Sequence, residues 1–361
     1  MEENFVFSRF FRKFVNYKAI NILFGMKKGT LEDIVKETGY SKTTISRVLN
    51  GKSKEYRISA TATNKILDIA QRIDYRPNIA AQMLRNKTSN AIGLILPSIN
   101  NLLFSNLASK IITEANSYNY TVVLIDTQED PVFESKALDT LINRNIDGII
   151  LVPSERAPER IETVAQTIPL ILVDRYFENS SLPYISTNNY EGGYQAVKML
   201  IDSGHTNILC LGIPEISIAF KERIRGCMAA VNDSGKNIQL SVSGNESSIQ
   251  SGYVETQLAL AKTDRPTAIF TLSNSILLGA FEALKEKKMS IPEDMSIISF
   301  DSNIYLDYLN PPITRVAQPV ERMGIAALHL VLESIKEKKD LDSHLLMSPS
   351  VIVRDSIRIL S

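Results

Sequence analysis

After residue 90, short continuous apolar runs alternate with longer stretches that have helical patterning. Seven runs stand out: IGLIL from 92, TVVLI from 121, GIILV from 148, PLILV from 169, ILCL from 208, TAIF from 267 and SIISF from 296. Apolar runs without alternation are typical of parallel strands that are buried on both faces. Helical stretches lie between most of them, at 101–117, 131–143, 190–203, 273–287 and 320–336. The pattern predicts α/β units with right-handed connections.

The region 91–361 is too long for one comfortable hydrophobic core, so we expect two lobes, each with a doubly wound parallel sheet. The stretch STNNYEGGY at 186–194 and the neighbourhood of Gln318 are the expected crossing points. The predicted N-lobe is therefore about 91–187 plus 318–338. The predicted C-lobe is about 188–317 plus 339–361.

Between residues 31 and 73 the apolar spacing is helical. Leu31, Ile34 and Val35 share one face, and Gly39 is a natural helix stop. Ser41 is a good N-cap for a second helix, whose inward stripe is formed by three residues. These are Ile45, Val48 and Leu49. A third helix, with Ile66, Ile69, Ala70 and Ile73 on one face, completes a three-helix core.

The second helix has a continuous polar face, because four of its residues fall at i, i+3, i+4 and i+7. They are Thr43, Ser46, Arg47 and Asn50. Short hydrogen-bonding side chains and an Arg on such a face are how a helix-turn-helix reads the major groove of DNA. A plain three-helix bundle with a solvated polar face has the same pattern, and pattern alone favours neither.

The next segment, YRPNIAAQMLRNKTSN at 75–90, predicts a helix of about two turns from Pro77, too short to be stable alone. It carries Leu84, Arg85 and Lys87 and has no obvious core to pack on. A basic, marginal helix suits a segment that folds on DNA, where its leucine could wedge between base steps. A simple linker is the alternative interpretation.

Charge separates the two regions. Residues 26–90 hold 13 Lys and Arg against 6 Asp and Glu, a net of +7, whereas 91–361 hold 23 against 32, a net of −9. A basic head on an acidic body is typical of a head that binds phosphates. The first 25 residues hold six of the 13 Phe and lack the features of a signal peptide. We expect Met26 to be the initiator, with 1–25 disordered or mis-assigned.

The order and spacing of TLEDIVKETGYSKTTISRVLNGK, YRPNIAAQMLR and SNAIGLILPSINN resemble the lactose-repressor (LacI/GalR) family, over about Met26 to Ile357. The resemblance implies a helix-turn-helix domain at 26–76, a hinge at 77–90 and a periplasmic-binding-protein-like core at 91–361. It also implies base reading by Lys42, Thr43 and Arg47, and minor-groove insertion by Leu84. The residues implied to hold mostly phosphates are Ser41, Thr44, Ser46, Asn50 and Arg85.

Ligands of parallel sheets bind beyond the carboxyl ends of the strands. That rule selects Asp126, Asp174 with Arg175, and Asp301. The resemblance adds three effector-binding residues, Phe104, Arg223 and Asn274. Each has a plainer interpretation: Arg223 pairs with Asp301, Phe104 lies in the core, and Asp126 caps a helix. Many sugar-responsive relatives carry Asn-Asp where this chain has Asn274-Ser275, which puts a simple hexose effector in doubt.

No phosphate-binding loop, dinucleotide turn, nucleophile elbow or Cys pair at metal spacing occurs. Cys210 and Cys227 are expected as buried thiols in a reducing cytoplasm. We therefore expect no catalytic residues, metal, cofactor or membrane span. The expected protein is a cytoplasmic, sequence-specific transcription regulator and repressor, a homodimer on a near-palindromic operator, controlled by a small effector such as a sugar or sugar derivative. The alternatives are control by a protein co-regulator, and a solute-binding protein or α/β enzyme.

Overall fold

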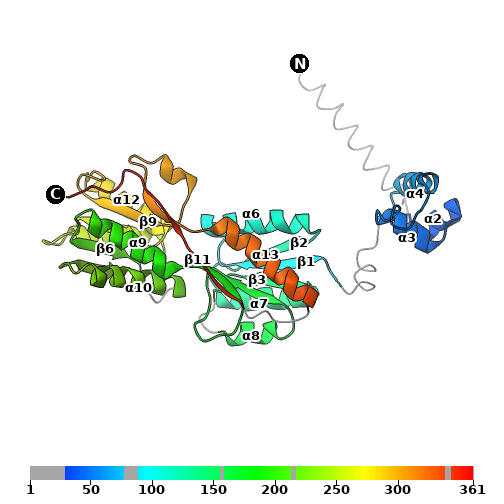
Figure 1. The fold of residues 1–361 in the computed structure, drawn as a ribbon, viewed down its shortest axis with the longest axis horizontal. Coiled ribbons are helices and arrows are strands. Elements are labelled where there is room, and N and C mark those ends of the chain that lie inside the picture. Colours follow the sequence, from blue (N-terminus) through cyan, green and yellow to red (C-terminus); the bar gives the residue numbers. More distant parts are fainter. Residues whose placement is uncertain (1–28, 77–87, 155–157, 213–216, 338–342, 361) are drawn as a thin grey trace, which may run out of the picture. The chain divides into compact units, whose positions relative to one another are not determined.

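The computed structural model describes residues 29–76, 88–154, 158–212, 217–337 and 343–360 (Figure 1). These residues form two compact units, one on each side of residues 77–87. The extension at 1–25 lies outside the described residues, as does most of the predicted hinge with Leu84 and Arg85.

The first unit consists, in its described part, of α2 (Leu31–Thr38), α3 (Lys42–Leu49) and α4 (Ala60–Arg72). Thr30 and Asp33 form a capping box at the start of α2, and Ser41 and Ser59 cap α3 and α4. Gly39 ends α2 with a φ of 76°, a conformation that glycine adopts without strain, so the chain can turn at once into α3. The core residues are Ile34, Ile45, Val48, Ile66, Ile69 and Ala70. The predicted helix-turn-helix is confirmed.

The second unit contains two six-stranded sheets of the same strand order. In the first, the order is β11-β5-β4-β3-β1-β2, and every described pair is parallel. Its strands are β1 (Ala91–Leu96), β2 (Thr121–Asp126), β3 (Gly148–Leu151), β4 (Leu170–Val173), β5 (Tyr184–Thr187) and β11 (His344–Met347). Helices α6 (Leu102–Ser117) and α13 (Val320–Glu337) cover one face, and α7 (Pro131–Asn143) and α8 (Glu159–Ala165) cover the other.

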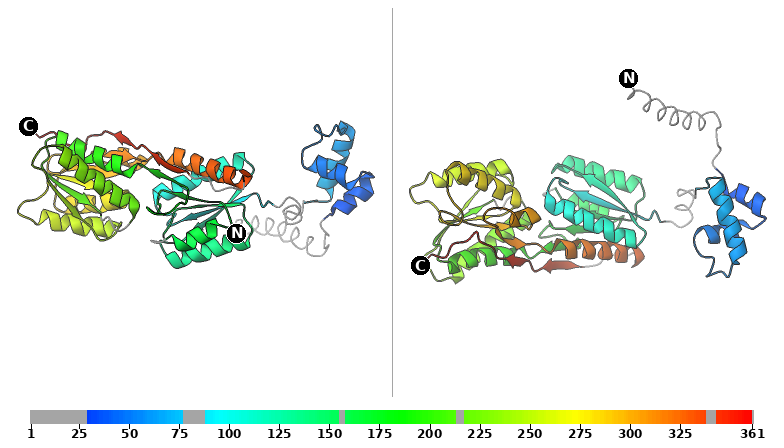
Figure 2. Two further views of the ribbon diagram at one scale, coloured as in Figure 1. Left: turned by 60° about the horizontal axis from the view of Figure 1, so that its bottom comes forward. Right: turned by 90° about the horizontal axis from the view of Figure 1, so that it is seen from above.

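The second sheet has the order β12-β10-β9-β8-β6-β7. Its strands are β6 (Asn207–Leu211), β7 (Gln239–Ser243), β8 (Ala268–Thr271), β9 (Ser296–Phe300), β10 (Thr314–Ala317) and β12 (Ser350–Ile352). All pairs are parallel except β12 with β10. The helix pair α9 (Asn189–Asp202) and α10 (Ile218–Asp233) lies on one face, and α11 (Ile249–Leu260) and α12 (Asn274–Glu286) lie on the other (Figure 2). The two predicted doubly wound lobes are therefore confirmed.

The chain passes between the lobes three times. Two passages, after β5 and after β10, lie in the stretch 186–194 and at Gln318, where they were expected. The third lies between β11 and β12, and it corrects one expectation: the segment 339–361 does not belong wholly to the second lobe. His344–Met347 pairs with β5 of the first sheet. An edge strand of four residues joins its sheet mainly through backbone hydrogen bonds, so its side-chain pattern does not indicate which sheet it joins.

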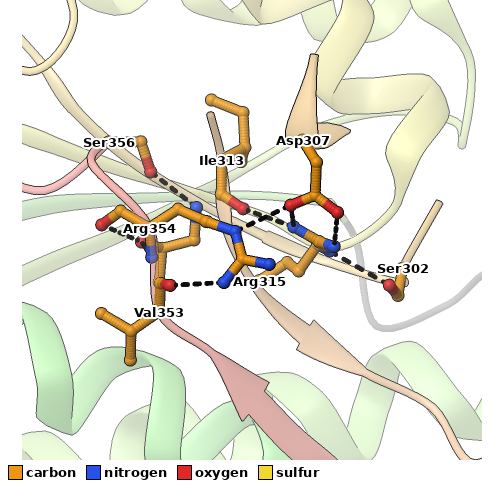
Figure 3. Close-up of polar contacts among 8 residues, drawn as sticks. Ser302, Asp307, Ile313, Arg315, Val353, Arg354 and Ser356 are labelled. Atoms are coloured by element: carbon orange, nitrogen blue, oxygen red, sulfur yellow. Dashed lines mark hydrogen bonds and ion pairs between the residues drawn. The ribbon is translucent and has the colours of Figure 1, made fainter. Parts of the chain in front are cut away.

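An ion-pair cluster fastens the returning strand β12 to the second lobe (Figure 3). Asp307 ends the short 3-10 helix η1 (Ile304–Asp307) and accepts hydrogen bonds from Arg315 Nη1 and Nη2 at 2.9 and 2.8 Å. Arg354 Nε donates to the same carboxylate at 2.7 Å. The hydrogen bond from Arg315, followed by that from Arg354, lowers the pKa of Asp307 to about 2. The buried Arg315 is thus neutralised within the protein.

Candidate functional site

The polar face of α3 is open to solvent. Lys42, Thr43, Arg47 and Asn50 are exposed, while Ile45 and Val48 are buried in the unit's core. Ser41 accepts a hydrogen bond from the Thr44 amide at 3.1 Å and lies 2.9 Å, oxygen to oxygen, from the Thr44 hydroxyl. The structure thus displays the predicted residues of α3 together on one surface. Leu84 and Arg85, predicted for the same role, lie outside the described residues.

Two of these side chains are already engaged within the unit. Lys42 forms an ion pair with Glu32 of α2, and the hydrogen bond from Lys42 lowers the pKa of that carboxyl. Asn50, the C-cap residue of α3, donates from its side chain to the Ser46 carbonyl at 2.8 Å. Arg47 makes a different contact, because its guanidinium lies 3.9 Å from the centroid of the Tyr56 ring.

A cleft of about 1040 Å³ lies between the two lobes of the second unit. It lies beyond the carboxyl ends of the strands in both sheets, as the rule for parallel sheets predicts. Five of the seven residues predicted to bind a ligand line it: Phe104, Asp174 and Arg175 from the first lobe, and Arg223 and Asp301 from the second.

Arg223 is held in the cleft wall by the close packing of α9 against α10. A Cβ atom at Gly193 would lie 2.0 Å from the carbonyl oxygen of Arg223, and a Cβ atom at Gly226 would lie 2.0 Å from the carbonyl oxygen of Tyr190. Both positions therefore require glycine. Arg223 Nε donates to Asn189 at 2.8 Å, and Nη1 donates to the Leu272 carbonyl. Burial lowers the pKa of Arg223, while the carboxylates of Asp301 and Asp174 oppose that shift.

Arg175 forms the opposite wall. Its Nη1 and Nη2 atoms each lie 2.7 Å from an oxygen of Glu129, which is a bidentate ion pair. Nη1 also donates to the Pro153 carbonyl at 3.1 Å, and the guanidinium lies 5.7 Å from the centroid of the Phe104 ring. Glu129 therefore belongs to the cleft as well, and sequence reasoning missed it.

Two buried aspartates complete the charged part of the cleft. Asp301 accepts a hydrogen bond from Gln318 at 2.6 Å. Asp174 has a buried Oδ1 atom that finds no hydrogen-bond partner among the described residues. Burial raises the pKa of Asp174 to about 6, although the positive charges of Arg223 and Arg175 act in the opposite direction.

The other two predicted residues lie differently. Asp126 is not among the residues that line the cleft, because its carboxylate accepts hydrogen bonds from the backbone amides of Ile99 and Gln128 and shapes the adjoining loops. Asn274 begins α12 between two lining residues, Ser273 and Ser275. Sequence reasoning also missed the serines of the second lobe's wall, among them Ser217, Ser248 and Ser273. Each of these three is the N-cap of a helix that follows a strand, and that pattern could have identified them.

Within the described ranges, no helix is long and apolar enough to cross a membrane. Over the same residues, no group of three or more His, Cys, Asp or Glu side chains is arranged to hold a metal ion. Cys210 and Cys227 are both free thiols and both buried.

Two family models match the chain, one for each unit. Residues 30–78 match the bacterial regulatory proteins of the lacI family, and residues 89–351 match the periplasmic binding proteins and sugar binding domain of the LacI family. The PurR transcriptional repressor of Vibrio cholerae is 31% identical over 92% of this chain and 99% of its own length.

Solved structures show the same fold. The lac repressor dimer, bound to operator and an anti-inducer, matches with a TM-score of 0.81 at 23% identity, covering 92% of this chain and 100% of the solved one. A LacI-family regulator from Enterococcus faecium with bound ribose matches with a TM-score of 0.69 at 27% identity, covering 75% and 100%.

A helix-turn-helix unit joined to a two-lobed core with a polar interlobe cleft defines the class of DNA-binding transcription regulators that carry a ligand-binding core. Both family matches and the full-length similarity to repressors agree with that class. The chain belongs to the LacI family of bacterial regulatory proteins.

Proposed function

We propose that this protein represses transcription by binding a near-palindromic operator through α3, as a homodimer, under the control of a small effector in the interlobe cleft. In this proposal Lys42, Thr43 and Arg47 read base edges in the major groove. The residues that hold phosphates are Ser41, Thr44, Ser46, Asn50 and Arg85, and Leu84 enters the minor groove. Two copies are needed because one recognition helix reads few bases.

The effector is a small polar molecule, with a sugar or sugar derivative as the favoured class. The observation that carries this proposal is the cleft between the lobes, which offers the buried side chains of Arg223, Asp174 and Asp301 to a ligand. Guanidinium donors and carboxylate acceptors suit neighbouring hydroxyl groups, and the ring of Phe104 suits an apolar face. The ribose bound to the E. faecium regulator supports the same class.

The effector controls the protein only if it binds one arrangement of the two lobes better than the other. A protein that acts on operator DNA works in the cytoplasm, and we place this one there. We also propose that it is not an enzyme, which the repressor function of its relatives supports.

The test begins with selection of duplexes by the purified full-length chain from a library with palindromic symmetry. Arg47→Ala should then lose about 1–3 kcal/mol of discrimination at one base position of each half-site. A thermal-shift screen with sugars, sugar acids, nucleosides and purines should identify a ligand that raises the melting temperature of the core. Absence of any preferred duplex, whichever metabolite is present, contradicts the function. Operator binding that responds to a protein and to no metabolite would replace the effector with a co-regulator.

A further inference from the structure

The turn between α3 and α4 places an aromatic ring against the side chain of Arg47. The guanidinium carbon lies 3.9 Å from the centroid of the Tyr56 ring, which is the spacing of a close cation–π contact. Tyr56 is 42% exposed, and it is not among the residues of the hydrophobic core of its unit. Its ring therefore contributes little to the core, and its described contact is with Arg47.

The turn that carries Tyr56 is closed by backbone hydrogen bonds. The Lys52 amide donates to the Arg47 carbonyl at 2.9 Å, which ties the turn directly to α3. The Tyr56 amide donates to the Lys52 carbonyl at 3.1 Å, and the Ile58 amide donates to Ser53 at 2.8 Å. These bonds fix where the backbone of Tyr56 lies relative to Arg47.

Stacking occupies the face of a guanidinium and leaves its N–H donors free, because they point outward in the plane of the group. In the described part of the chain, no hydrogen bond or ion pair uses the Arg47 side chain. Lys42 differs, since it is paired with Glu32. Arg47 is thus held by one face while its paired donors stay available to a bidentate acceptor.

We infer that Tyr56 is a positioning residue that orients Arg47 for bidentate contact with a guanine edge. This inference rests on the proposed function, in which Arg47 reads a base. The stack restricts the rotamers of a long side chain before DNA arrives, so less conformational entropy is lost when the two hydrogen bonds form. Tyr56 acts through Arg47, and its aromatic face rather than its hydroxyl performs the role.

The experiment uses the full chain and the duplexes that wild-type protein selects from a palindromic library. The readout is the specificity ratio: affinity for the preferred duplex divided by affinity for the duplex altered at the base position that Arg47→Ala relaxes. Tyr56→Leu should lower this ratio about 3- to 10-fold, since it removes the stack. Tyr56→Phe keeps an aromatic face and should hold the ratio within about twofold of wild type.

A double-mutant cycle separates positioning from other roles. In an Arg47→Ala background, Tyr56→Leu should have no further effect on the ratio. Lys54→Ala is the matched control, because this exposed cation of the same turn should weaken binding to both duplexes equally and leave the ratio unchanged.

The outcomes are distinct. If wild-type protein selects no duplex, the proposed function fails. If it selects one and Tyr56→Leu leaves the ratio unchanged, or still lowers it without Arg47, the positioning role is overturned. Tyr56→Phe behaving like Tyr56→Leu, with both variants melting at the wild-type temperature, overturns the stacking explanation.

Discussion

In each lobe, an aspartate directly follows the strand at the same place in the sheet. The hydrogen bonding of the two aspartates differs. Asp174 directly follows β4 and Asp301 directly follows β9, and their φ angles are 66° and 75°. Asp301 is bonded to Gln318, whereas the buried Oδ1 of Asp174 has no partner among the described residues. Strained left-handed conformations at non-glycine positions gather at ligand sites. The comparison indicates that the aspartate of the second lobe is bonded to the crossing segment at Gln318, whereas the aspartate of the first lobe keeps an acceptor for a ligand.

The cation that both aspartates share is Arg223, whose charge acts on each carboxylate. Of the variants considered, Arg223→Met should have the largest effect. It should lower the free energy of unfolding of the core by about 3 kcal/mol. The variant removes the donor to Asn189 and to the Leu272 carbonyl, and it takes away a buried positive charge that acts on Asp174 and Asp301. Urea denaturation at neutral pH measures the loss.

Arg225→Met is the matched control for that variant. Arg225 lies on the same helix, its side chain is 61% exposed, and it pairs with Glu222. Glu222 is only 16% exposed, but Arg225 itself is largely in solvent, so this control should lose about 1 kcal/mol at most. Equal losses for the two variants would show that the buried position of Arg223 has no special importance.

Much of the fold could be predicted from the sequence, because most of the strands are continuous and mainly apolar runs. The seven apolar runs correspond to β1, β2, β3, β4, β6, β8 and β9. The others carry polar residues that tertiary contacts satisfy: Thr187 in β5 bonds to Gln318, and Arg315 in β10 pairs with Asp307. The edge strand β7 is half buried like β2, but its sequence, QLSVS, alternates polar and apolar residues instead of forming a continuous apolar run. No local pattern predicts partners that lie far away in the sequence.

The residues of the candidate sites were likewise only partly predictable from the sequence. The strand-end rule and the family resemblance together selected Phe104, Arg175, Arg223 and Asp301, all of which line the cleft. Neither indicated Tyr56, because its contact with Arg47 depends on how the turn at 52–58 folds. The missing hydrogen bond of Asp174 is likewise a property of packing, which a sequence pattern does not contain.

Asp174→Asn should change the stability of the core in the opposite direction from Arg223→Met. Because the folded pKa is raised to about 6 from 3.8, the native carboxyl binds a proton that the unfolded chain has released between these values. Stability therefore falls as pH rises from about 4 to 6, and the penalty persists above pH 6. Removing the charge should stabilise the ligand-free core at pH 7 by up to about 3 kcal/mol.

Asp301→Asn is the control for this prediction, since the new amide oxygen can still accept from Gln318 and no comparable gain is expected. Denaturation curves at several pH values between 4 and 8 give the measurement. Wild type and Asp174→Asn should have similar stability near pH 4, separate as pH rises from about 4 to 6, and keep a constant separation above pH 6. Parallel curves for the two proteins would show that Asp174 is not the group that titrates.

The smallest expected effect comes from an exposed ion pair that joins the two lobes. Lys221 Nζ on α10 lies 2.9 and 2.8 Å from the two carboxylate oxygens of Glu178, in the loop after β4. Both side chains are about half exposed, so the pair contributes about 0.5 kcal/mol at most, and salt screens it.

This pair joins opposite lobes, and Lys221→Met should therefore weaken effector binding about twofold at low salt and not at about 1 M salt. Lys198→Met removes an equally exposed pair with Asp202 within α9, inside one lobe, and should leave effector affinity unchanged. Calorimetric titration of both variants at the two salt concentrations separates these cases: a salt-independent loss, or equal losses in both, would mean that the interlobe pair does not favour the effector-bound arrangement.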